Sequence, residues 1–121
     1  MATRGRGARR KGANFERWLA NTLSEMTGLE AKRGLAQTRG GGAEVSDVSI
    51  DYIHVEAKNH IRCNIKAALV QAINDSEQSG KMPVAITKDD RKPVLCTMLL
   101  DDWITLFNAY IEKQEGLTQE E

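Results

Sequence analysis

Residues 47–58 read Asp-Val-Ser-Ile-Asp-Tyr-Ile-His-Val-Glu-Ala-Lys, and this stretch decides the fold that the sequence predicts. It predicts two short antiparallel strands that turn at Asp51–Tyr52. Side chains alternate between the two faces of a strand. One face therefore carries the apolar residues Val48, Ile50, Ile53 and Val55. The other face carries the polar residues Asp47, Ser49, His54, Glu56 and Lys58. In this register Val48 lies opposite Val55, and Asp47 lies opposite Glu56.

The facing carboxylates of Asp47 and Glu56 need an explanation, because like charges opposite each other destabilise a strand pair. Lys58 supplies one positive charge on the same face. A divalent cation would supply more, and oxygen-only ligands suit hard ions such as magnesium or manganese. Such an ion beside a lysine activates water and neutralises a phosphate in its transition state. The stretch indicates metal-dependent phosphodiester hydrolysis, and a solvated hairpin face of mixed charge is the alternative.

The order of these residues resembles a known nuclease signature. Asp47, eight intervening residues and then Glu56-Ala57-Lys58 are similar to the core motif of the PD-(D/E)xK nuclease superfamily. Within it, the chain is most similar to archaeal and phage Holliday-junction resolvases. Those proteins carry a helical glutamate after a Lys/Arg-Gly stretch, matched here by 11–17, and a glycine-rich loop before the aspartate, matched by 39–42. Ser46 departs from the pattern, because a proline often stands at that position.

The resemblance implies an α/β fold with a restriction-endonuclease-like three-layer core, in which helices flank a central mixed β-sheet. Asp47, Glu56 and the carbonyl of Ala57 would hold Mg²⁺, with Mn²⁺ as a substitute. Lys58 would activate the attacking water or stabilise the charge on the phosphate. The remaining catalytic candidates are Glu16, which would assist the metal or its water, and Gln71 on the following helix.

The activity implied is a Mg²⁺-dependent endodeoxyribonuclease that hydrolyses phosphodiester bonds in branched DNA, such as a four-way junction. A homodimer is expected, since a two-fold interface places two identical sites around a junction. Two alternatives stay open. One is a nuclease of the same superfamily that nicks duplex DNA or acts on duplex ends. The other is a DNA-binding module without catalytic activity.

Length and composition are those of an ordinary globular protein. A chain of 121 residues, 40% hydrophobic and 28% charged, fits a single domain with a small core. No apolar run approaches the roughly 20 residues that span a bilayer, and no apolar segment follows the basic N-terminus. Cys63 and Cys96 stand alone, as expected for reduced cysteines in a cytoplasmic protein, or in the host cytoplasm if a phage encodes it.

The net charge of zero hides an asymmetry between the two halves of the chain. Residues 1–66 hold 12 Lys/Arg and 7 Asp/Glu, whereas residues 67–121 hold 5 and 10. A basic half attracts a polyanion. We expect residues 1–12 to be a disordered basic arm that grips DNA phosphates, or else a solubilising tail. The expected DNA ligands are Arg4, Arg6, Arg9, Arg10, Lys11, Arg33 and Arg39.

Apolar periodicity predicts the other elements within one nuclease domain over residues 13–113. It predicts helices over 14–27 and 64–79, strands over 29–37, 82–87 and 93–100, and a last helix capped by Asp101 or Asp102. The apolar stripe of that last helix is expected in the core, with a dimer contact as the alternative: Trp103, Leu106, Phe107, Tyr110 and Ile111. Residues 114–121 are expected to be an acidic, frayed tail.

Overall fold

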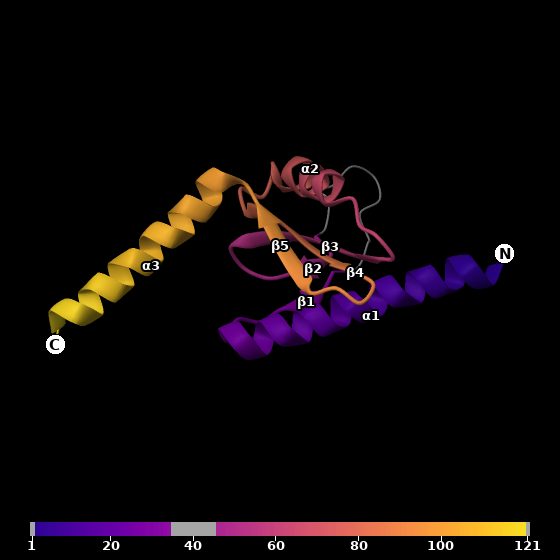
Figure 1. Cartoon of the computed structure of the whole chain (residues 1–121), viewed down its shortest axis with the longest axis horizontal. Helices are drawn as coiled ribbons and strands as arrows, with labels where there is room; N and C mark the ends of the chain where they lie inside the picture. Colours follow the sequence, from indigo (N-terminus) through magenta and orange to yellow (C-terminus); the bar gives the residue numbers. More distant parts are fainter. Residues whose placement is uncertain (1, 35–45, 121) are drawn as a thin grey trace.

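The computed structural model describes residues 2–34 and 46–120, and the side chains of residues 7–34 and 46–116. Its elements follow in the order α1 (Ala2–Thr27), β1 (Lys32–Arg33), β2 (Val48–Ser49), β3 (Ile53–His60), α2 (Ile65–Ser76), β4 (Met82–Asp89), β5 (Val94–Met98) and α3 (Leu100–Glu120). Figure 1 shows a small mixed sheet with α1 and α2 on opposite sides and α3 projecting from it. This confirms the expected α/β fold with helices flanking a central mixed sheet.

The sheet has the strand order β1-β2-β3-β4-β5. Among the described strands, β3 and β4 run parallel, and the other neighbouring pairs are antiparallel. Parallel neighbours need a crossover connection, and α2 supplies it between β3 and β4. Asn64 begins this helix, because its side-chain oxygen accepts a hydrogen bond from the N–H of Ala67 at 3.0 Å. The prediction of Asn64 as the N-cap is confirmed.

The hairpin register predicted from residues 47–58 is confirmed. Val48 pairs with Val55, and Ser49 pairs with His54. The chain turns through Tyr52, whose φ of 77° lies in the left-handed region. The apolar face of the hairpin packs under α1 in a buried cluster: Phe15, Leu19, Ala20, Val48, Ile50, Val55, Ala57, Val84 and Ile86. The polar face therefore points to the opposite side of the sheet, where α2 contacts β3 and β4.

Helix α1 corrects the expectation of a disordered arm, because it begins at Ala2 instead of Asn14. A helix anchored by Phe15 and Leu19 gains one hydrogen bond for each residue added at its end. Most of the residues added, alanine, arginine and lysine, favour helix formation. The ion pair of Lys11 with Asp90, beyond β4, holds this part of α1 against the sheet. The side chains of Arg4 and Arg6 lie outside the described part of the chain.

The strand expected over 29–37 is shorter in the structure, where β1 covers only Lys32–Arg33. The rest of that predicted strand, the glycine-rich loop and Arg39 fall within residues 35–45, outside the described residues. Among the residues described, none of the helices combines the length and the apolar character needed to cross a bilayer.

Helix α3 differs from three expectations. It begins at Leu100, so that Asp101 and Asp102 lie in its first turn and do not cap it. Its apolar stripe is exposed instead of buried: the exposed fraction is 48% for Trp103 and 44% for Phe107. The helix also continues to Glu120, through most of the tail that was expected to fray. Helical periodicity predicted the helix correctly but could not say what its apolar side contacts.

Candidate active site

Asp47 lies immediately before β2, where the regular pairing with β3 ends at Val48 and Val55, and the chain still brings it next to Glu56. The N–H of Asp47 donates to the carbonyl of Val55 at 2.9 Å, which ties the start of β2 to β3. The carboxylate of Asp47 in turn accepts a hydrogen bond from the N–H of Ala57 at 2.8 Å through Oδ2. This bond fixes the Asp47 carboxylate against β3, directly beside Glu56.

Glu56 is almost completely buried, with an exposed fraction of 3%. Its Oε1 lies 3.2 Å from Nζ of Lys58, two residues along the same face of β3. Burial, and after it the negative charge of Asp47, raise the pKa of Glu56 to about 7 against the opposing influence of Lys58. A buried carboxylate in this surrounding has a strong affinity for a positive charge, whether a proton or a metal ion.

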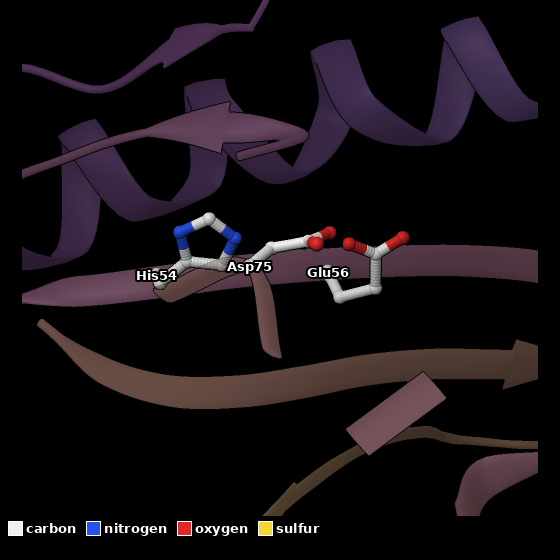
Figure 2. Close-up of side chains that lie close together, drawn as sticks. All are labelled: His54, Glu56 and Asp75. Atoms are coloured by element: carbon white, nitrogen blue, oxygen red, sulfur yellow. The ribbon is translucent and has the colours of Figure 1, made fainter. Parts of the chain in front are cut away.

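Two further groups join this face. The ligand atoms of His54, Glu56 and Asp75 all lie within 4.8 Å of one another. Figure 2 shows these three side chains meeting over β3. Asp75 comes from the last turn of α2, so the crossover helix closes the site from the side opposite α1.

His54 is buried to the same extent as Glu56, with an exposed fraction of 3%. Among the described residues its Nε2 has no hydrogen-bond partner. A buried polar atom left without a partner costs about 1–3 kcal/mol. Burial lowers the pKa of His54, against the opposing influence of Asp75 and Asp47. His54 is therefore a neutral imidazole near pH 7, which is the form that binds metal ions.

The sequence pointed to α2 but named Gln71 as its site residue, whereas the structure brings Asp75 to the site. Gln71 is exposed and lies one helical turn before Asp75. Residues i and i+4 share a helix face, so Gln71 lies on the same side of α2. The sequence did contain a signal for Asp75, because it is an acidic residue one helical turn after Gln71 on the helix that follows the Glu56 strand. A role for Gln71 stays a prediction.

Glu16 lies elsewhere. Its Oε1 accepts a hydrogen bond from Nε of Arg33 at 2.7 Å, and both side chains are partly buried. Arg33 pairs with Val48, so it shares the apolar, α1-facing side of the sheet. Asp47 and Glu56 are on the other side. The structure therefore brings together Asp47, Glu56 and Lys58, and it places Glu16 in an ion pair where α1 meets β1.

The candidate DNA ligands that the structure describes lie on α1 and β1. Arg9 and Arg10 are exposed on α1. Lys11 forms an ion pair with Asp90, and Arg33 forms one with Glu16. Their contacts with DNA stay predictions.

The donor set on the polar face fits a divalent cation. Asp47, Glu56 and Asp75 contribute carboxylate oxygens, and Lys58 is in direct contact with only one of them, Glu56. Carboxylate oxygens are the ligands that Mg²⁺ and Mn²⁺ prefer. The unpartnered Nε2 of His54 adds a nitrogen donor next to them. Two of these residues, Asp47 and Glu56, are the metal ligands expected from the sequence.

The fold is α/β, and one face of its mixed sheet carries the buried carboxylate of Glu56, the adjacent carboxylate of Asp47 and the amine of Lys58. The chain matches a family model described as "Phage putative PDDEXK endonuclease" over residues 7–119, and it belongs to that family. No curated protein and no solved structure matches the chain. Family membership confirms the predicted PD-(D/E)xK superfamily. The family is one of phage nucleases, which implies DNA as the class of substrate.

Proposed function

We propose that this protein is a metal-dependent endodeoxyribonuclease that cuts branched DNA, acting in the cytoplasm of a phage host. The observation that carries the proposal is the arrangement of Asp47, Glu56 and Lys58. The Asp47 carboxylate is fixed by the N–H of Ala57, and Lys58 Nζ lies 3.2 Å from the buried carboxylate of Glu56. The family assignment supports the nuclease class. The preference for branched DNA rests on the resemblance to Holliday-junction resolvases.

The residues of the site would have separate roles in binding the metal and in catalysis. Asp47, Glu56 and the carbonyl of Ala57 would hold Mg²⁺, or Mn²⁺ in its place. A bound divalent ion supplies Lewis-acid charge and lowers the pKa of water. Lys58 would orient the attacking water and stabilise negative charge that develops on the phosphate. Glu56 would exchange its proton for the metal, because its pKa of about 7 puts that proton within easy reach near neutral pH.

Substrate binding would use the basic surface formed by α1 and β1. Arg9 and Arg10 are exposed on α1. Lys and Arg side chains contact phosphates without regard to sequence, and such binding weakens with salt. Arg4, Arg6, Lys11, Arg33 and Arg39 would add further phosphate contacts. Glu16, from α1, would assist the metal or its water, and Gln71, on the same side of α2 as Asp75, would assist at the site. The homodimer is supported by the exposed apolar side of α3.

The test compares a labelled four-way junction, a linear duplex and a single strand, each with and without Mg²⁺. The proposal expects symmetric cuts in the junction that require the metal. An Asp47→Asn variant serves as the inactive control, because the amide cannot replace the carboxylate charge. Metal-dependent cutting of duplex or duplex ends alone would support the related nuclease instead. Salt-sensitive binding with no cleavage in either Mg²⁺ or Mn²⁺ would support a DNA-binding module.

A further inference from the structure

The polar face of β3 carries more ligand groups than the Asp47–Glu56 pair requires. His54, Glu56 and Asp75 place their ligand atoms within 4.8 Å of one another. Two oxygens bound to one ion at about 2.1 Å each lie no more than roughly 4.2 Å apart. Small side-chain rotations therefore bring the three groups around a common ion.

A second observation points to a ligand at the same place. His54 is buried, and its Nε2 has no hydrogen-bond partner among the described residues. This imidazole lies beside two carboxylates, one of them almost completely buried. Neither protonation of Glu56 nor its contact with Lys58 gives Nε2 a partner. A cation between the imidazole and the carboxylates satisfies all three groups at once.

We propose that His54 and Asp75 join Glu56 as ligands of a divalent transition-metal ion, so that the site binds Mn²⁺ more tightly than Mg²⁺. Imidazole nitrogen suits transition metals, whereas Mg²⁺ prefers oxygen ligands alone. The inference rests on the proposed function, because Glu56 belongs to both ligand sets. It extends the ligand set from the hairpin to the last turn of α2.

The test uses the whole chain, free of DNA, and Mn²⁺ alone as the probe. Bound Mn²⁺ is counted by the loss of its free electron paramagnetic resonance signal, and pulsed measurements detect a ligating ¹⁴N. The chain has only two histidines, and His60 is exposed. We expect a nitrogen coupling in the unmodified protein that His54→Gln removes and His60→Gln retains. Asp75→Asn should weaken Mn²⁺ binding by at least about tenfold, as expected for loss of a charged ligand.

The Mn²⁺ measurement on the unmodified protein tests the inference even if a variant fails to fold. Bound Mn²⁺ without nitrogen coupling overturns the inference, and so does a nitrogen coupling that survives His54→Gln. Failure of the inference is distinguishable from failure of the proposed function. Mg²⁺-dependent DNA cleavage by a protein whose Mn²⁺ shows no nitrogen ligand would reject the role of His54 and leave the nuclease in place.

Discussion

Asp75 on α2 and Glu56 on β3 hold their carboxylate oxygens within 4.8 Å of each other, with the imidazole of His54 equally close. The two residues belong to successive elements of one β-α-β unit. The crossover that makes β3 and β4 parallel therefore also carries an acid to the polar face.

Replacing Lys58 with alanine should slow junction cleavage by about 10²–10⁴-fold, the usual contribution of a positioned proton-transfer group. Lys58 is the cation in direct contact with Glu56. Junction binding should remain, because it depends on phosphate contacts elsewhere. Single-turnover cleavage and a gel-shift assay measure the two effects. Lys66→Ala, an exposed lysine on α2, is the control, and unchanged cleavage in Lys58→Ala would remove this lysine from the mechanism.

The stability of the metal-free protein should fall as the pH rises from about 4.5 through about 7. Glu56 has a folded-state pKa of about 7 against 4.5 ordinarily, so the folded state holds a proton that the unfolded state releases. The protonated Glu56 therefore contributes its full stabilisation below pH about 4.5, the pKa in the unfolded state. This contribution is lost as the pH rises through about 7, the pKa in the folded state, and the free energy of unfolding falls by about 3 kcal/mol in total.

Urea unfolding at several pH values measures this slope, and Glu56→Gln should flatten it. The same slope in both proteins would mean that other groups cause the pH dependence. Addition of Mn²⁺ near neutral pH should restore stability to the unmodified protein more than to the Gln variant.

Glu16→Gln should reduce cleavage less than Asp47→Asn does. Glu16 is held by Arg33 on the α1-facing side of the sheet, whereas Asp47 is fixed beside Glu56. Cleavage rates at saturating Mg²⁺ provide the comparison, with Arg33→Gln as a partner variant. An equal loss in Glu16→Gln and Asp47→Asn would show that Glu16 reaches the metal directly.

Val55→Ala should lower the free energy of unfolding by about 2 kcal/mol through lost burial and the cavity left behind. Val55 has no exposed surface and lies at the centre of the cluster between α1 and the hairpin. Val70→Ala on α2, where the exposed fraction is 54%, should change it by less than about 0.5 kcal/mol. Similar losses in the two variants would mean that the hairpin does not anchor the core.

The central hairpin could be predicted from the sequence because strand alternation couples side-chain type to face. Once Val48 and Val55 share the buried side, Asp47 and Glu56 must share the other. The contribution of Asp75 was missed because helical periodicity leaves the rotation of a polar residue at the edge of the stripe undetermined. Gln71 and Asp75 lie on the same side of α2, one turn apart, and only tertiary packing shows which one reaches β3.

The environment of α3 could not be derived from its sequence, since an amphipathic pattern is the same whether the helix packs on its own chain or on another. Trp103 and Phe107 therefore suggested a core stripe that the structure does not contain. The position of the Glu16 side chain could not be predicted from the sequence either. Its place in α1 was predicted, but its pairing with Arg33 depends on a two-residue strand that carries no apolar pattern.

Strand β5 is an edge strand of the sheet. It ends the sheet, so one row of its backbone N–H and C=O groups faces outward, alongside the exposed side chains of Val94 and Leu95. Unprotected outer strands act as templates for the addition of foreign strands, and nearby charges discourage this. Arg91 and Lys92, immediately before the strand, are the charges available for that purpose. Recombinant protein in which both are neutralised should precipitate at lower concentration than the original chain, although neither residue belongs to the core or to the acidic site.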